Sequence, residues 1–175
     1  MKYVYEFTNQ RKLTKAEFLK WFSKKALYTI RKFKMIKKGD KVYYENKRNF
    51  KDVVLEDILK RFSEKGNIVL LKNKASTYNK IAISSTLDSE SESFISKLIK
   101  EKPENFKNLT PISGKIIKPL YLFLDKEVLL YAKLQKLKFK KSSFKETRFS
   151  EIINNLEKKH PEIKFSIIKG YLELN

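Results

Sequence analysis

Short apolar runs alternate with amphipathic segments along the 175-residue chain, and this alternation restricts the fold more than any other feature of the sequence. Continuous apolar runs are typical of strands that are buried on both faces of a parallel sheet. Segments with apolar residues at helical spacing lie between and after these runs. The expected strands lie within 37–45, 67–72 and 80–84, and the expected helices span 50–62 and 88–100. We therefore predict an α/β fold, a three-layer sandwich with a small, mainly parallel sheet.

Both ends of the chain extend this pattern. Lys2–Phe7 predicts a strand, and the capping-box pattern Thr14 to Glu17 predicts a helix that runs to about Met35. One face of that helix is apolar and another is basic. Lys115–Phe123 predicts an extended segment. The remaining expectations are a helix over 126–137 capped by Asp125, a helix over 151–159 capped by Ser150, and a last strand or short helix over 164–168.

The basic surplus is concentrated in two segments. The chain carries 40 Lys and Arg against 20 Asp and Glu, a net charge of +20. Residues 11–51 hold 15 basic and three acidic residues, and residues 133–148 hold seven basic and one acidic. Two solvated faces would account for such segments, but their concentration favours one shared basic surface. A polyanion, most commonly nucleic acid, is the natural partner of such a surface.

Several kinds of site are excluded by composition. The chain has no cysteine, which excludes disulfides, thiolate-bound metals, iron–sulfur clusters and cysteine nucleophiles. His160 is the single histidine, which excludes a cluster of histidine metal ligands. We expect no metal site and no cofactor. No apolar run approaches the ~18 residues of a membrane span, and the N-terminus lacks a signal-peptide core. We expect a cytoplasmic protein with no membrane contact.

Five colinear segments resemble the PP-loop tRNA 2-thiouridine synthetases, the enzymes of cytosolic and archaeal tRNA thiolation. "KIAISSTLDSESESFISKLI" resembles the Lys-Ile-Ala-Thr-Gly-His-Asn-Leu-Asp-Asp-Glu-Ala motif of that family and the helix after it. "IIKPLYLFLDKEVLLYAKLQKL" resembles its Pro-Leu strand and Glu-Val-Ala-Leu-Tyr-Ala helix. The other three segments are "FLKWFSKKALYTIRK", "TIRKFKMIKKGDKV" and "LEKKHPEIKFSIIKGYLEL".

The resemblance implies a PP-loop-like α/β domain over residues 37–175, truncated mainly between Lys60 and Lys80. It also implies that residues 1–36, a strand and a basic helix, are the vestige of a zinc-finger region. The family's pyrophosphatase loop reads Ser-Gly-Gly-Lys-Asp-Ser and cradles phosphate with backbone N–H groups. Residues 45–52 of this chain contain no glycine, which disfavours close approach to a phosphate.

These departures lead us to expect a pseudoenzyme without catalytic residues. The resemblance implies a vestigial nucleotide pocket made by Asn46, Lys47, Arg48, Ser85 and Asp88. A solvated turn explains Lys47 and Arg48 as well, and a helix N-cap explains Asp88 as well.

The preferred hypothesis is a non-catalytic tRNA-binding subunit that pairs with an active thiolation enzyme, or with itself as a homodimer. The alternatives are a structural or regulatory subunit without RNA binding and a residual ATP-dependent RNA-adenylating enzyme. The candidate RNA-binding residues are Lys20, Lys24, Arg31, Lys34, Lys37, Lys38, Lys47, Arg48, Lys118, Lys138, Lys140 and Lys141.

Overall fold

The computed structural model of the chain describes residues 2–66, 68–72, 77–100, 109–140 and 147–173. A small antiparallel hairpin, β1 (Tyr3–Glu6) and β2 (Lys12–Thr14), leads directly into the long helix α1 (Lys15–Lys32). The hydroxyl of Thr14 accepts from the backbone N–H of Glu17, and the Glu17 carboxylate accepts from the Thr14 N–H at 2.8 Å. This reciprocal cap, which the sequence predicted, fixes where α1 begins.

The central sheet has five strands in the order β4-β3-β5-β7-β6. Its strands are β3 (Lys41–Tyr44), β4 (Val69–Leu71), β5 (Lys80–Ala82), β6 (Ile112–Ser113) and β7 (Ile116–Ile117). All neighbours are parallel except β6 and β7, which form a tight antiparallel hairpin. Gly114 turns that hairpin at a positive φ of 57°, a conformation that costs glycine little.

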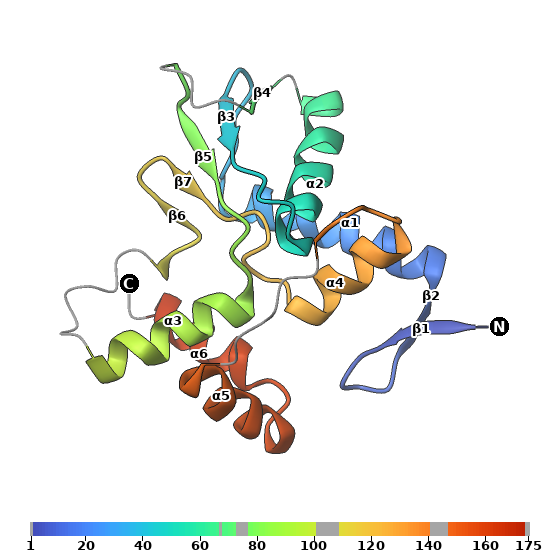
Figure 1. Cartoon of the computed structure of the whole chain (residues 1–175), viewed down its shortest axis with the longest axis vertical. Helices are drawn as coiled ribbons and strands as arrows, with labels where there is room; N and C mark the ends of the chain where they lie inside the picture. Colours follow the sequence, from blue (N-terminus) through green and yellow to red (C-terminus); the bar gives the residue numbers. More distant parts are fainter. Residues whose placement is uncertain (1, 67, 73–76, 101–108, 141–146, 174–175) are drawn as a thin grey trace.

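One face of the sheet packs against α1, α2 (Phe50–Gly66) and α4 (Asp125–Leu134) (Figure 1). Val42 and Tyr44 of β3 point into this core, together with Ala82 and Ile117 of the neighbouring strands, and all four are buried. Burial of these side chains with the apolar stripe of α1 gives the fold its main hydrophobic stabilisation. We call this side the covered face of the sheet.

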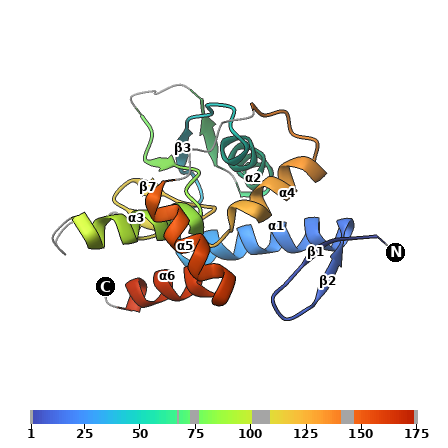
Figure 2. The same ribbon diagram turned by 60° about the horizontal axis from the view of Figure 1, so that its bottom comes forward.

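The helices α3 (Leu87–Lys100), α5 (Arg148–Lys159) and α6 (Ile163–Glu173) form a separate helical group. They lie beyond the end of the sheet where β5 leads into α3, at the bottom of Figure 1 and toward the viewer in Figure 2. A second apolar cluster joins this group to the segment before α4, through Leu87, Tyr121 and Ile168. The α/β class with a mainly parallel sheet is thus confirmed, with three helices against one face of the sheet and three in a group beyond its end.

Buried Glu127 on α4 ties the N-terminal hairpin to the rest of the molecule. Its carboxylate accepts from the Tyr5 hydroxyl at 2.9 Å, from the Lys25 ammonium at 2.8 Å and from the Leu124 N–H at 3.0 Å. Tyr5 and Lys25 belong to residues 1–36, whereas Glu127 belongs to residues 37–175. The division into these two parts stays a prediction, and the main apolar cluster contains residues of both.

Several predicted boundaries differ from the structure. The segment predicted to be extended, Lys115–Phe123, contains only the two-residue strand β7, because Pro119 follows it and the chain then turns through hydrogen bonds from Tyr121 to Lys118 and from Phe123 to Leu120. For residues 164–168 the helix alternative is correct, and the helix is longer than predicted, because α6 spans Ile163–Glu173. Helix α1 ends at Lys32 and α4 at Leu134, because Lys34 and Lys136 adopt positive φ values.

The predicted caps of two helices also need correction. Helix α5 begins after Thr147, whose hydroxyl accepts from the N–H of Ser150, so Ser150 is not the cap. Helix α4 begins at Asp125, whose side chain makes other contacts, and Leu124 occupies the cap position. Within the described residues, no helix has the length and apolar character needed to cross a membrane.

Candidate nucleic-acid interface

In the loop between β3 and α2, side-chain oxygens accept hydrogen bonds from backbone N–H groups of the same loop. Asp52 accepts from the N–H of Lys47 at 3.0 Å, and the Asn46 side chain accepts from the N–H of Arg48 at 2.7 Å. Asn49 caps α2 by accepting from the N–H of Asp52 at 2.9 Å. A phosphate cradle needs free N–H groups directed at the ligand. In this loop, side-chain oxygens of the chain itself accept from three such donors, the N–H groups of Lys47, Arg48 and Asp52.

Asp52 acts as an internal anion at the centre of this loop. Besides the Lys47 N–H, its carboxylate accepts from the Asn49 amide at 2.7 Å and from the Ser84 hydroxyl at 2.5 Å. Its side chain is 7% exposed. A buried carboxylate with three donors is well satisfied, so the loop is stable without an external phosphate.

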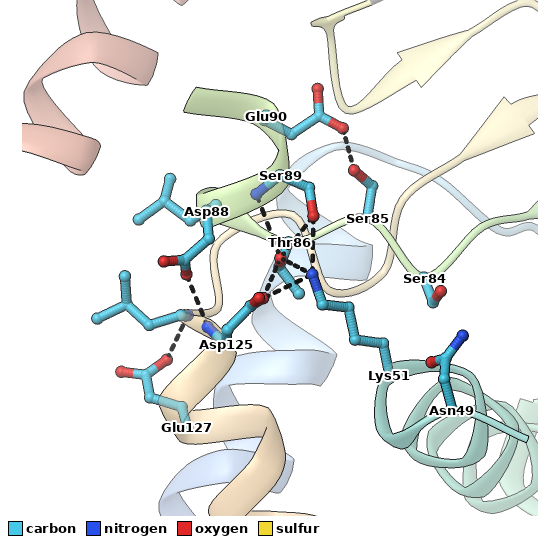
Figure 3. A network of polar contacts seen from close by, with 12 residues as sticks. Asn49, Lys51, Ser84, Ser85, Thr86, Asp88, Ser89, Glu90, Asp125 and Glu127 are labelled. Atoms are coloured by element: carbon cyan, nitrogen blue, oxygen red, sulfur yellow. Dashed lines mark hydrogen bonds and ion pairs between the residues drawn. The ribbon is translucent and has the colours of Figure 1, made fainter. Parts of the chain in front are cut away.

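Next to Asp52, the ammonium group of Lys51 enters a polar network between the starts of three helices (Figure 3). It contacts Asp125 at 2.8 Å, Ser89 at 2.8 Å and Thr86 at 3.2 Å. Thr86 donates in turn to Asp125 at 2.5 Å. Burial raises the pKa of Asp125, and the charge of Lys51 opposes this rise. The cation of Lys51 is therefore directed into the protein rather than toward solvent.

Asp88 and Ser85, predicted to line the vestigial pocket, belong to the same region but have structural partners. Asp88 accepts from the N–H of Asp125 at 2.7 Å and from the ammonium of Lys164 at 2.6 Å. The N-cap interpretation of Asp88 is wrong, because α3 begins one residue earlier and Thr86 accepts from the N–H of Ser89 at 3.5 Å. Ser85 donates to Glu90.

Lys118 lies inside the protein, in contrast to the other predicted cations. Its ammonium pairs with Glu90 at 2.8 Å, and both side chains are 4% exposed. Burial lowers the pKa of Lys118, while the Glu90 carboxylate opposes this change. We therefore remove Lys118 from the proposed RNA-binding surface, since its charge is directed to an internal carboxylate.

The other predicted cations are exposed, and the two basic segments meet. The exposed residues are Lys20, Lys24, Arg31, Lys34, Lys37, Lys38, Lys47, Arg48, Lys138 and Lys140, and Lys141 lies outside the described residues. The N–H of Lys140 donates to the carbonyl of Arg48 at 2.7 Å, and the rings of Phe50 and Phe139 are 6.3 Å apart. We call Lys47, Arg48, Lys138 and Lys140 the basic junction, because it joins residues 11–51 to 133–148.

Sequence reasoning missed the importance of Lys51 and Asp52. The predicted pocket used the residues that directly follow the strand, Asn46, Lys47 and Arg48. Comparison from the helix side places Lys51-Asp52 on the Lys-Asp pair of the Ser-Gly-Gly-Lys-Asp-Ser motif. That pair, directly after the helix cap Asn49, was the signal available in the sequence.

A cavity of about 520 Å³ lies between the starts of α3 and α4 and the pair α5–α6. Asp88, Asp125, Glu157 and Lys164 line it, and Lys164 pairs with Glu157 at 2.6 Å. Among the described residues, no group of three or more histidine, cysteine, aspartate or glutamate side chains is arranged to hold a metal ion. The cavity therefore carries mixed charge. Lys164 pairs with Asp88 and Glu157 within the wall, Asp125 pairs with Lys51 outside it, and Lys126 and Lys158 also line the cavity.

Of three comparisons with known proteins, the one with solved structures finds a match to this architecture. No protein-family model and no curated protein matches the chain. Among solved structures, the U34-tRNA thiolase NcsA from Methanococcus maripaludis with its [4Fe-4S] cluster superposes with a TM-score of 0.80 at 19% sequence identity, over 98% of this chain and 84% of that one. The chain has the PP-loop-like fold of that thiolase.

The donor set for an iron–sulfur cluster is absent from this sequence. Such clusters are held by cysteine thiolates, and the chain has no cysteine. The residues present therefore do not fit the cluster that the thiolase contains.

Proposed function

We propose that this protein is a non-catalytic tRNA-binding subunit of U34-tRNA thiolation, acting in the cytoplasm with a catalytically active thiolase. The observation that carries the proposal is the basic junction, where the hydrogen bond from Lys140 to Arg48 joins the two cation-rich segments. Exposed Lys and Arg side chains bind phosphates and position an RNA without reading its sequence. Among RNAs we propose tRNA, because the chain shares its fold with a tRNA thiolase.

Two features support a role in binding rather than in chemistry. Asp52 and Asn46 accept from two backbone N–H groups of the loop, those of Lys47 and Arg48, which are then not directed at a phosphate. The chain also has no thiol to carry sulfur. A subunit of this kind presents the tRNA while the active partner supplies the loop and the cluster.

The experiment measures binding of fluorescently labelled tRNA by anisotropy between 50 and 200 mM salt. If about six phosphates are contacted, affinity falls about 10³-fold over this range. The variant Arg48→Glu/Lys140→Glu reverses two charges of the junction and should weaken binding at least tenfold at 50 mM salt. The matched control Lys159→Glu/Lys169→Glu reverses two exposed charges on α5 and α6, helices of the separate group that contain no residue of the junction.

Equal loss in both variants would mean that only net charge matters and would contradict a defined surface. Absence of salt-sensitive tRNA binding would contradict the RNA role and favour the structural or regulatory alternative. Co-purification with an active thiolase tests the partner separately.

A residual enzyme is the second candidate, and the retained Lys51-Asp52 pair favours it. In that case ATP would displace the contacts of Lys51 with Asp125 and Ser89. Release of pyrophosphate from ATP in the presence of tRNA tests this function. Loss of that release in Lys51→Met would support it, and no release by the wild-type protein would exclude it.

A further inference from the structure

The two faces of the central sheet are not equally covered. The strand register places one set of side chains opposite the covered face, and we call this set the open face. All of its members keep part of their surface in solvent, and Val69 and Ile83 are 50% and 37% exposed. None belongs to an apolar cluster formed by described residues. The apolar residues of the open face are Tyr43, Val69, Leu71, Ile81, Ile83 and Ile116, and the same register places Lys41 and Ser113 on this face.

An apolar face of this kind is unusual for parallel strands. Parallel sheets occur almost only where helices cover both faces. Here α1, α2 and α4 cover one face, while α3, α5 and α6 form a group at the end of the sheet (Figure 1). Contiguous exposed apolar side chains on a protein surface mark interaction sites.

We propose that the open face binds an amphipathic helix of another protein, whose apolar stripe is flanked by acidic residues. This goes beyond the proposed function, because it assigns a second surface that is independent of the basic junction. A helix laid on the sheet restores the layer that a parallel sheet normally has. Its anchors at positions i, i+3, i+4 and i+7 would contact the aliphatic side chains of neighbouring strands.

Charge identifies the chemistry of the occupant. Lys41 at the start of β3 and Lys115 before β7 are exposed, and the ammonium of Lys115 lies 5.6 Å from the ring of Tyr78, which packs on Tyr43. Two acids flank β3, and both have partners within the chain. Asp40, directly before Lys41, is buried and accepts from the N–H of Lys37 at 2.7 Å and from the Asn79 amide at 2.9 Å. Glu45, directly after the strand, pairs with Lys47 at 3.5 Å. Acidic residues on the partner complement this cationic rim.

The same charge argues against a second copy of this chain on the open face. Each copy carries +20, and like-charged surfaces repel on approach. Composition argues against RNA there, since bases stack on aromatic rings and five of the six apolar side chains of the face are aliphatic.

The test uses a labelled 18-residue helical peptide with Leu at one stripe and Glu on both flanks. A second peptide carries Lys in place of Glu, and a third has the acidic composition in scrambled order. Binding to the full-length protein is followed by anisotropy. We expect the acidic amphipathic peptide to bind at least tenfold more tightly than either of the others.

The variant Val69→Ser/Ile83→Ser removes the two most exposed apolar side chains of the open face and should weaken peptide binding at least tenfold. The control Leu98→Ser/Ile99→Ser makes the same chemical change at exposed positions on α3 and should leave binding unchanged. Circular dichroism and urea titration check that both variants are folded. Affinity for tRNA should be the same in both, which separates this proposal from the RNA-binding function.

Four outcomes would overturn the proposal. These are equal binding of the three peptides, no binding, a selective loss of tRNA affinity in Val69→Ser/Ile83→Ser, and a homodimer in sedimentation that this variant dissociates. The third would assign the face to RNA, and the fourth would assign it to a second copy.

Discussion

Asp52 holds together a loop that would otherwise have unpaired donors. Replacing it with alanine leaves the Lys47 N–H, the Ser84 hydroxyl and the Asn49 amide without their acceptor. We expect Asp52→Ala to lower the free energy of unfolding by about 2–3 kcal/mol, since unpaired buried polar groups cost about 1–3 kcal/mol each and this loop is partly solvated. Urea denaturation measures the change.

Asp52→Asn keeps an acceptor oxygen at the same place and should cost less than Asp52→Ala. Glu45→Ala, which removes an exposed carboxylate from the same loop, should change stability by less than about 0.5 kcal/mol. Equal stability of Asp52→Ala and the wild type would show that the loop hydrogen bonds contribute nothing.

The free energy of unfolding should depend on pH through Glu56, whose pKa is lowered in the folded protein. Burial alone would raise the pKa of Glu56, but hydrogen bonds from Lys60, Asn46 and Tyr44 outweigh it and lower the pKa from 4.5 to about 2. Because the pKa is lower in the folded state, the stabilisation is complete above about pH 4.5 and is lost as pH falls toward 2. Its size is about 1–3 kcal/mol.

The comparison is between wild type and Glu56→Gln in urea titrations from pH 7 to pH 2. The variant should be less stable at pH 7, and the difference should shrink below about pH 4.5. A difference that does not depend on pH would mean that side-chain packing, rather than the charge of Glu56, is responsible.

At the scale of elements, Lys164 connects α6 to α3 and α5. Its ammonium lies 2.6 Å from both Asp88 and Glu157, and its side chain is 6% exposed. We expect Lys164→Met to lower the free energy of unfolding by about 3 kcal/mol, near the lower end for a broken buried pair, because the two carboxylates keep 24% and 22% of their surface in water. Lys169→Met, on the exposed side of α6, is the control and should be nearly neutral.

Hydrogen exchange gives this prediction a local readout. Amides of α5 and α6 should exchange faster in Lys164→Met, while those of α1 and β3 keep their protection. Uniform acceleration across the molecule would show that Lys164 contributes to global stability only.

The sequence predicted the elements well because apolar periodicity is local. The capping box at Thr14 fixed the start of α1, and the apolar runs located β3 and β5. The hairpin of β6 and β7 was missed, because strands of two residues carry no measurable period. The helix ends at Lys32 and Leu134 depend on positive φ values at Lys34 and Lys136, which the sequence does not predict because lysine rarely adopts them.

The polar site could be predicted only in part, because its contacts join distant positions. Lys51 meets Thr86 across 35 residues, and Lys164 meets Asp88 across 76. Exposed cations were identified from charge alone. The burial of Lys118 against Glu90 depends on the fold, and the local sequence pattern does not predict it.

At the scale of the whole molecule, the charge of +20 predicts two opposite responses to salt. Self-repulsion destabilises the compact state, and salt screens it. We expect the unfolding free energy to rise by about 1 kcal/mol, or about 2–4 °C in Tm, between low and physiological salt. Affinity for tRNA should fall over the same range.

Thermal unfolding in sodium chloride, with tRNA anisotropy in the same buffers, measures both responses. Lys20→Gln/Lys24→Gln lowers the charge on α1 and should reduce both slopes. If Tm falls with salt, paired charges rather than repulsion dominate the folded state.

The three donors of Glu127 have a consequence for the order in which the molecule is made. Tyr5 and Glu127 are 122 positions apart, so at about 5–20 residues per second the ribosome needs roughly 6–24 s to deliver the second after the first. The hairpin and α1 leave the exit tunnel long before their shared acceptor. During that interval the Glu127 carboxylate has not been synthesised. Tyr5 and Lys25 of the nascent N-terminal region can therefore form their hydrogen bonds to it only after α4 has been made.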